Sequence, residues 1–419
     1  MDIHDYKDIV GVKDNNIRKL TENWRPGTSK NITFIVTKDC QLACKYCYLV
    51  GKNEKERMSW EVAKAAIDYV LDRENDPNFA YESVIWDFIG GEPFLEIDLI
   101  DQICDYIKTE LFRRNHHWFN SYRFSFSTNG INYHTEKVQR FIEKNKSHLS
   151  IGITIDGTRR KHDLNRVYKH SEKGSYEDVV KNIPLWQEQF PFEGTKVTIS
   201  SADIPYICES VLHLYDLGIH QVNINCVFED VWQAGDDARF EEQLMQLADA
   251  IIDRGLYEDY ACSFFSENMG KPLDCHLQNQ NWCGAGKMLS IDAAGNFYPC
   301  TRFAQYSLRD KEAWIIGNIR DGIDNNKLRP FLTLDRCTQS QPECVECEVA
   351  EGCAWCQGEN YDAAATHTVF QRATAICLMH KARVRANNYY WNKLYRKLET
   401  EGKREEFESK HSMSNDKIC

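Results

Sequence analysis

The chain lacks any apolar run of about 18 residues, which is the length that a membrane-crossing helix needs. Its first 30 residues also lack the apolar core and the small-residue cleavage site of a secretory signal. These absences predict a cytoplasmic protein with no membrane partner. In a reducing cytoplasm, clustered cysteines more often bind metal or act in catalysis than form disulfides.

Positive charge is in the minority, with 51 Lys and Arg against 63 Asp and Glu, a net charge of −12. This balance excludes a general nucleic-acid-binding role, because such proteins need a basic surface for phosphates. The sequence also lacks an internal repeat and any low-complexity tract, which excludes a solenoid. We therefore expect no nucleic-acid partner.

The length of 419 residues predicts two or three domains with ample material for a buried core. Composition and periodicity suggest five segments. They are a polar extension (1–30), a region of alternating strands and helices (31–240), a bridging region (241–270), a cysteine-rich region (271–380), and a C-terminal helix with its tail (381–419).

Strand-like and helix-like patterns alternate from residue 31 to about residue 229. Repeated β-α units indicate a parallel sheet, and six units predict a partial (β/α)6 barrel, an α/β fold. In barrels the chemistry lies at the carboxyl ends of the strands. The predicted strands are Ile32–Val36, Ser83–Ile89, Tyr122–Ser127, Leu149–Ile155, Lys196–Ile199 and Gln221–Val227.

Cysteine is abundant, with 17 residues, and three of them form a Cys-x3-Cys-x2-Cys loop directly after the first predicted strand: Cys40, Cys44 and Cys47. Three thiolates can hold a four-iron cluster with one iron left free of protein ligands, and this free iron can bind a substrate. A zinc site is the alternative, although structural zinc sites usually have four ligands, often in paired Cys-x2-Cys units.

A second motif, Gly90-Gly91-Glu92-Pro93, follows the second predicted strand. The two glycines would let a ligand approach the backbone, and Glu92 could hold a ligand ammonium. The alternative is an ordinary turn in which proline begins a helix. A further pair, His116-His117, was interpreted as a surface turn, because adjacent helical residues face different directions.

Together, the cysteine loop with its aromatic Tyr46 and the Gly-Gly-Glu-Pro motif resemble the radical SAM enzymes. The resemblance implies that the free iron binds the amino and carboxylate groups of S-adenosylmethionine (SAM). Reductive cleavage would then give a 5′-deoxyadenosyl radical that abstracts a hydrogen atom.

The resemblance also implies a set of SAM-contacting residues. Arg166 would bind the SAM carboxylate, which suits its planar guanidinium, and Asp156 would either accept a proton or cap its loop. The implied cofactor-binding residues are Tyr46, Gly90, Gly91, Glu92, Ser127, Asn129, Thr154, Arg166 and, through its backbone, Val227.

The cysteine-rich region resembles the SPASM domain, which holds two auxiliary four-iron clusters in maturases of ribosomal peptides and proteins. Three clusters in all are therefore implied. One auxiliary cluster would use Cys283, Cys300, Cys356 and an upstream cysteine, Cys275, with Cys262 and Cys337 as alternatives; the other would use Cys344, Cys347, Cys353 and Cys377. The usual Cys-x3-Cys is Cys-x2-Cys here at Cys356, and a two-zinc ribbon is the alternative.

The residue after Cys300 bears on the substrate. Sulfatase maturases have an aspartate there that is thought to act as a base, whereas this chain has Thr301, which cannot accept a proton at neutral pH. The resemblance therefore favours thioether-forming maturases of the sactipeptide or ranthipeptide type, possibly the branch that acts on Cys-x3 repeats. A carbon–carbon link, residue oxidation as in sulfatase maturases, and a non-catalytic iron–sulfur carrier are the alternatives.

These relatives act on a cysteine-rich precursor peptide and receive electrons from a donor of the flavodoxin or ferredoxin type. Many of them carry an N-terminal winged-helix domain of roughly 80 residues, longer than a minimal domain. Only 39 residues precede Cys40. We therefore expect the peptide leader to bind the barrel face, the termini or a separate leader-binding protein.

Overall fold

The structure, a computed structural model, describes residues 29–52, 54–267, 269–275 and 283–415. The predicted N-terminal extension (1–30) lies outside these ranges, apart from its last two residues, which begin β1. No helix in the described ranges is long and apolar enough to cross a membrane.

All six predicted strands are present, and they run parallel within two sheets. β1 to β4 pair in chain order in one sheet, and β5 pairs with β6 in the other. Their bounds are β1 Ser29–Thr37, β2 Ser83–Gly90, β3 Tyr122–Thr128, β4 Leu149–Ile153, β5 Thr195–Ile199 and β6 Gln221–Cys226, followed by the short β7, Ala261–Cys262.

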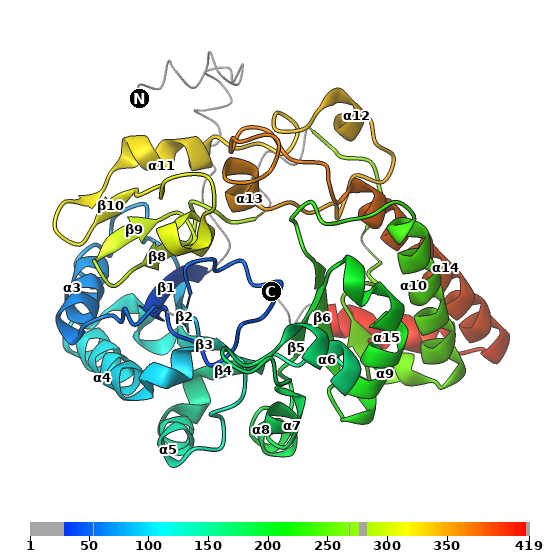
Figure 1. The fold of residues 1–419 in the computed structure, drawn as a ribbon, viewed down its shortest axis with the longest axis horizontal. Helices are drawn as coiled ribbons and strands as arrows, with labels where there is room; N and C mark the ends of the chain where they lie inside the picture. The colour runs from blue at the N-terminus through cyan, green and yellow to red at the C-terminus, as the bar shows by residue number, and fades with distance from the viewer. Residues whose placement is uncertain (1–28, 53, 268, 276–282, 416–419) are drawn as a thin grey trace.

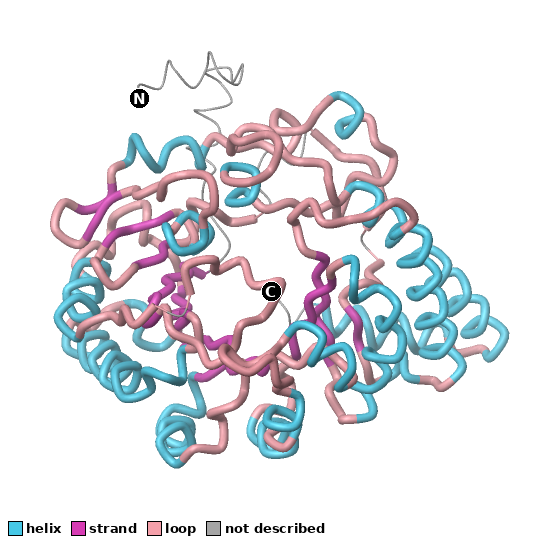
Figure 2. Tube along the Cα trace, in the orientation of Figure 1, coloured by secondary structure: helices cyan, strands magenta, loops and turns pink. Residues whose placement is uncertain are grey.

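The two sheets join at Thr195, whose hydroxyl donates to the Ile153 carbonyl at 2.8 Å and accepts from the Ile155 amide at 3.1 Å. The strands thus curve round one centre with the helices outside them (Figure 1), and Figure 2 shows the same outer ring of helices. The prediction of a partial barrel is confirmed. The barrel helices are α3 Trp60–Leu71, α4 Ile97–Arg113, α5 Glu136–Asn145, α6 Arg159–Asn165, α7 Tyr176–Val180, α8 Ile183–Gln189, α9 Ile207–Asp216 and α10 Asp236–Asp253.

Local sequence explains where these helices form. The Ser59 side chain caps α3 by accepting from the Val62 amide, and the apolar residues of α3 are buried against the sheet. In α4 the buried positions recur at helical spacing, at Ile100, Ile103 and Ile107. The helices therefore cover the outer face of the barrel, and the carboxyl ends of the strands remain free for loops.

The cysteine-rich region extends the barrel sheet. β8 (Leu289–Ile291) pairs in parallel with β1, and it continues through β9 (Asn296–Tyr298), β10 (Gly317–Asn318) and β11 (Gly322–Ile323). The buried Lys30 side chain fastens this junction by donating to the Lys287 carbonyl at 2.6 Å. The short helices of this region are α11 Asn325–Leu332, α12 Pro342–Val345 and α13 Gln357–Tyr361.

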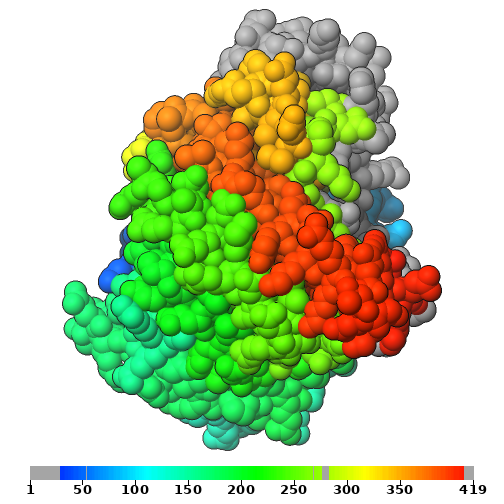
Figure 3. Space-filling view, turned by 90° about the vertical axis from the view of Figure 1, so that its right-hand side faces the viewer, coloured from blue at the N-terminus to red at the C-terminus, as the bar shows by residue number. Residues whose placement is uncertain are grey.

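The C-terminal helix α14 (Cys377–Glu401) packs along α10, and α15 (Arg404–Asn415) follows it. Tyr389 and Lys393 of α14 both bond to Asp249 at 2.7 Å. Figure 3 shows this red helix and the orange segment before it lying against the green part of the barrel. The helix therefore ties the cysteine-rich region to the last units of the barrel.

Candidate functional site

The cysteine loop follows β1 at the carboxyl end of the sheet, where the other strand-end loops hold it. Its backbone amides at Ala43 and Lys45 donate to the carbonyls of Val167 (2.8 Å) and Asn165 (3.1 Å). On the other side, the Gly51 amide donates to the Tyr306 carbonyl at 2.8 Å. The chain at and just after the end of α6 thus fixes the position of the three thiols from one side, and the cysteine-rich region fixes it from the other.

The Gly-Gly-Glu motif packs directly beneath this loop. A Cβ atom on Gly90 would lie 2.2 Å from the Thr37 carbonyl oxygen, and one on Gly91 would lie 2.1 Å from that of Asp39. The Gly91 and Glu92 amides donate to the same two carbonyls. These glycines therefore allow close approach to the end of β1 and the start of the cysteine loop, and their predicted contacts with SAM stay predictions.

The three thiols of the loop are electrostatic neighbours in sequence, Cys40 of Cys44 and Cys44 of Cys47. Burial, with the nearby charge of Glu92, raises the pKa of Cys40 to about 12. Burial also raises the pKa of Cys44, while the positive charge of Arg166 acts in the opposite direction. Three converging thiols with no fourth protein ligand from the loop fit a four-iron cluster with one free iron.

Glu92 is buried and bonded to the chain itself. Its carboxylate accepts from the Phe94 amide (3.1 Å), the Thr128 hydroxyl (2.6 Å) and the Asn129 amide (2.7 Å). Burial raises its pKa. The Asn129 side chain in turn donates to Gln41 of the cysteine loop at 3.0 Å. In this structure Glu92 links the ends of β2 and β3 to the loop.

A buried chain of polar groups runs from Arg166 to Asp156 through Tyr46. The Arg166 guanidinium donates to the Tyr46 hydroxyl at 2.9 Å, and that hydroxyl donates to Asp156 at 2.5 Å. Burial acts to raise the pKa of Asp156, but Lys161 and Arg166 outweigh it, and the pKa lies below its usual value. The ionised Asp156 therefore orients Tyr46 and, through it, Arg166.

Arg166 has a buried hydrogen-bond donor without a partner. Its Nε atom is buried with no hydrogen-bond partner among the described residues. A buried, unsatisfied guanidinium nitrogen is costly to the fold, so it fits a site that an anionic ligand completes. The carboxylate of SAM, which the sequence had assigned to Arg166, has the required charge and shape.

A cavity of about 530 Å³ opens beside the cysteine loop. A second cavity, of about 550 Å³, shares Glu229, Val231 and Arg309 with the first and runs along residues 363–366 and 372–375 of the cysteine-rich region. Ligand sites of small molecules usually occupy about 300–1,000 Å³. The first cavity is lined by Lys45, Tyr46, Cys47, Asn165, Ser200, Ser201, Ala202, Pro205, Val227, Glu229, Val231, Gln233, Arg239 and Arg309.

The remaining predicted cofactor residues lie at the same end of the barrel. Val227 lines the first cavity, and its backbone amide donates to the Ile199 carbonyl. Ser127 accepts from the Lys196 ammonium at 2.7 Å, and the Thr154 amide donates to the Thr128 carbonyl at 2.9 Å. These three residues therefore stay predicted SAM contacts.

Sequence reasoning missed a charged group at the place where the two cavities adjoin. Arg302 forms an ion pair with Glu229 at 2.9 Å, and its guanidinium lies 4.2 Å from the Tyr48 ring centroid. Arg309 lies 3.8 Å from the same carboxylate. Glu229 follows β6 at its carboxyl end, and this position in a barrel was the signal that could have identified it.

Four cysteines of the second predicted auxiliary set line one cavity of about 210 Å³: Cys344, Cys347, Cys353 and Cys377. Arg372 lies beside them, donates to the Cys353 sulfur at 2.7 Å, and stacks 4.2 Å from the Trp355 ring centroid. Burial raises the pKa of Cys353 above its usual value, and the nearby charge of Arg372 offsets only part of this rise. Four thiols round one cavity, with a cation beside them, fit an anionic iron–sulfur cluster.

The first predicted auxiliary set is brought together only in part. Cys283 and Cys356 are electrostatic neighbours of Cys300, whose pKa burial raises. Cys275, however, forms a disulfide with Cys337, with their Cα atoms 5.9 Å apart. This corrects the assignment of Cys275 as the fourth ligand in this structure, because iron is bound by a thiolate and not by a disulfide sulfur.

The alternative fourth ligands fare no better here. Cys337 is the partner in that disulfide, and Cys262 lies buried on β7 in the barrel core. Cys356, whose spacing departs from the usual pattern, nevertheless lies with Cys300. The set therefore offers three thiols among the described residues.

Substitution of Cys353 by Ala is expected to remove one auxiliary cluster, because it takes one of four thiols from a buried cavity. Anaerobically reconstituted protein should then hold about four irons fewer per chain, while SAM cleavage continues. The matched control is Cys208→Ala, which changes a half-buried cysteine on α9 outside all three sets. Equal iron in both variants, or zinc in place of iron in the native protein, would contradict the cluster assignment.

Comparison with known proteins places this geometry in context. Residues 34–200 match the profile of the Radical SAM superfamily. An uncharacterised protein of Methanocaldococcus jannaschii is 28% identical over 304 residues, which cover 72% of this chain and 91% of that protein. The antilisterial bacteriocin subtilosin biosynthesis protein AlbA of Bacillus subtilis is 22% identical, with 77% of this chain and 66% of that protein covered.

The fold is similar to that of native anSMEcpe, solved with bound AdoMet and Kp18Cys peptide. The TM-score is 0.63 at 18% sequence identity, and the match covers 89% of this chain and 99% of that one. At this identity the likeness establishes the fold, including the cysteine-rich region that follows the barrel.

Proposed function

Since this chain is an enzyme with a radical SAM domain at residues 34–200, we propose that it matures a ribosomally made peptide by forming a thioether. The link joins a cysteine sulfur to a carbon atom of another residue in the peptide. The relatives support a peptide or protein substrate, because AlbA takes part in bacteriocin biosynthesis and anSMEcpe was solved with a bound peptide.

The observation that carries the proposal is that a second cavity adjoins the one beside the cysteine loop. One wall of the first cavity contains Tyr46 and Cys47 of that loop, and the second leads away across the cysteine-rich region. They meet at Glu229, Val231 and Arg309. The first cavity has the size of a cofactor site, and the second would give an extended peptide room next to it.

When bound, SAM and the iron–sulfur cluster of the cysteine loop would supply the radical chemistry that removes a hydrogen atom from the substrate. The protein's own residues position SAM. Arg166 presents its buried guanidinium, Tyr46 holds that guanidinium at 2.9 Å, and Asp156 fixes Tyr46. Because these three groups are buried, they are oriented before the ligand arrives, which reduces the entropy lost on binding.

The cysteine sets support three four-iron clusters and an external electron donor. Cys40, Cys44 and Cys47 would hold the cluster that meets SAM, and the two sets of the cysteine-rich region would hold the others. Formation of a C–S bond releases one electron after hydrogen abstraction, and an auxiliary cluster is a suitable acceptor. The donor would be of the flavodoxin or ferredoxin type, and a separate protein could present the peptide leader.

The group after Cys300 supports a thioether over residue oxidation. Thr301 offers no carboxylate, and its side chain is hydrogen-bonded to Tyr48. Glu229, the carboxylate that lines the first cavity, is paired with Arg302 and Arg309. Thr301 therefore cannot act as the base that oxidation of a substrate residue would need.

The test is the mass of the product from a synthetic peptide with Cys-x3 repeats, after iodoacetamide treatment. A thioether removes one hydrogen from carbon and one from sulfur. Each turnover should therefore lower the peptide mass by two hydrogens and leave one cysteine without its alkyl group. The same peptide with every cysteine replaced by serine should stay unchanged.

Loss of two hydrogens with every cysteine still alkylated would reject the thioether and identify a carbon–carbon link or residue oxidation. SAM cleavage without any change in peptide mass would reject this class of peptide. Absence of SAM cleavage in the fully reconstituted protein would instead favour an iron–sulfur electron carrier.

A further inference from the structure

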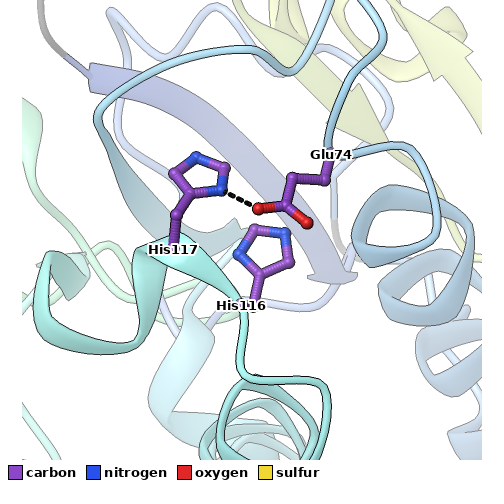
Figure 4. A group of neighbouring side chains, drawn as sticks. All are labelled: Glu74, His116 and His117. Carbon is purple, nitrogen blue, oxygen red and sulfur yellow. Dashed lines mark hydrogen bonds and ion pairs between the residues drawn. The ribbon is translucent and has the colours of Figure 1, made fainter.

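A separate cluster of ligand-type side chains lies at the amino end of the barrel. Glu74 follows α3, while His116 and His117 lie between α4 and β3, where the chain turns back to start new strands. Figure 4 shows the three side chains turned toward one another. One ligand atom of each lies within 4.8 Å of the others. The cysteine loop, by contrast, follows the carboxyl end of β1.

The two histidines face the same way, which corrects the interpretation of this pair as an ordinary surface turn. Their rings stack with centroids 4.6 Å apart and planes inclined by 21°. His116 is extended, with φ −69° and ψ 140°, and caps the short 3-10 helix His117–Asn120 that His117 begins. The rule for adjacent helical residues therefore does not apply to them.

His117 faces Glu74 with a nitrogen that carries no hydrogen in the neutral ring. Its Nε2 lies 2.8 Å from the Tyr81 carbonyl, which can only accept, so Nε2 holds the hydrogen. Its Nδ1 lies 2.6 Å from a Glu74 carboxylate oxygen. Two acceptors this close need a hydrogen or a metal cation between them.

His116 adds a buried nitrogen with no partner. Only 3% of the residue is exposed, and its Nε2 has no hydrogen-bond partner among the described residues. The other nitrogen, Nδ1, accepts from the Trp118 amide at 3.2 Å, a long bond. When a metal binds Nε2, the ring hydrogen moves to Nδ1, and the only hydrogen bond lost is the long one from the Trp118 amide.

We propose that Glu74, His116 and His117 bind a divalent cation of the zinc class. Two histidines and one glutamate form the ligand set of open zinc sites, in which water takes the fourth position. Imidazole favours zinc, nickel, copper and iron over magnesium and calcium. The absence of a thiol in the set distinguishes it from the cysteine sites that suit iron–sulfur clusters.

Small movements bring the ligands to coordination distance. Zinc bonds of about 2.0–2.2 Å in a tetrahedron place neighbouring ligand atoms about 3.3 Å apart. The Glu74 and His117 side chains are 42% and 36% exposed, so both have room to adjust. The bound cation would clamp the loop after α3 to the segment that leads into β3. The Tyr81 carbonyl already orients His117 from behind, as second-sphere partners of metal-binding histidines do.

The experiment is a calorimetric titration of the cluster-reconstituted protein with ZnCl2, with iron measured before and after. Native protein should bind one zinc per chain at this site without loss of iron. Glu74→Gln and His117→Ala should each weaken that binding by at least about 100-fold, since loss even of a second-sphere partner costs 10–100-fold. The control His134→Ala, at an exposed histidine outside the cluster, should bind zinc as the native protein does.

Thermal unfolding provides a second measurement. Zinc should raise the unfolding temperature of the native protein and of the His134→Ala variant, but not that of the two cluster variants, because only the folded site binds. Equal zinc affinity in the native and Glu74→Gln proteins would overturn the proposal. Absence of a zinc site in the native protein would also overturn it and would leave a proton as the shared cation.

Discussion

A variant with Cys40, Cys44 and Cys47 replaced by Ala is expected to cleave no SAM and to hold about eight irons per chain instead of about twelve. Backbone hydrogen bonds to Asn165, Val167 and Glu92 hold the loop that carries these three thiols. Without them the iron that binds SAM is lost, whereas the auxiliary sets keep all their ligands. The measurements are iron content and 5′-deoxyadenosine formed with a chemical reductant.

The matched control for this variant replaces three thiols elsewhere, namely Cys344, Cys347 and Cys353 of the 210 Å³ cavity. It should lose a similar amount of iron but continue to cleave SAM. Persistent cleavage in the first variant would show that the radical site is held by other cysteines. Loss of cleavage in both would mean that the clusters do not assemble independently.

Substitution of Arg166 by Lys is expected to raise the dissociation constant for SAM by about 10- to 150-fold. A hydrogen bond to a charged group contributes about 1.5–3 kcal/mol, and lysine keeps the charge but loses the planar fork. Lysine also cannot reproduce the bond from Arg166 to the Tyr46 hydroxyl in the same geometry. Equilibrium dialysis with SAM on the reconstituted protein measures the change.

Arg160→Lys is the control for this prediction, because Arg160 lies on α6, the helix that Arg166 directly follows, is exposed and stacks on Tyr206. It should leave SAM affinity unaltered. If Arg166→Lys also binds SAM as tightly as the native protein, the guanidinium does not contact the cofactor. Its buried contact with Tyr46 would then serve only the stability of the loop.

Local patterns in the sequence were sufficient to predict the barrel and the main ligand sets. The six strands follow from apolar segments between turns, and helix α3 follows from a capping serine and a helical apolar stripe. The spacing of Cys40, Cys44 and Cys47 within eight residues constrained their chemistry before any fold was known. Cys344, Cys347, Cys353 and Cys377 line one cavity, as the resemblance to the SPASM domain implied.

Tertiary structure decided the contacts between residues far apart in the chain. Glu92 bonds to Thr128 and Asn129 on the next strand, and the two glycines before it pack against residues 37–39. Neither role can be deduced from a motif, because each depends on how two strand ends are aligned. The Cys275–Cys337 disulfide, 62 residues apart in sequence, is a pairing of the same kind.

The sequence by itself indicated the type of chemistry. The cysteines of the loop and the residues of each strand-end motif lie within a few positions of one another, and the chain geometry between such residues varies little. The fold determined which groups face each other: the chain from Asp156 through Tyr46 to Arg166, the pairing of Arg302 with Glu229, and the pairing of His117 with Glu74. These arrangements follow from packing of β-α units around one centre, which adjacent residues do not encode.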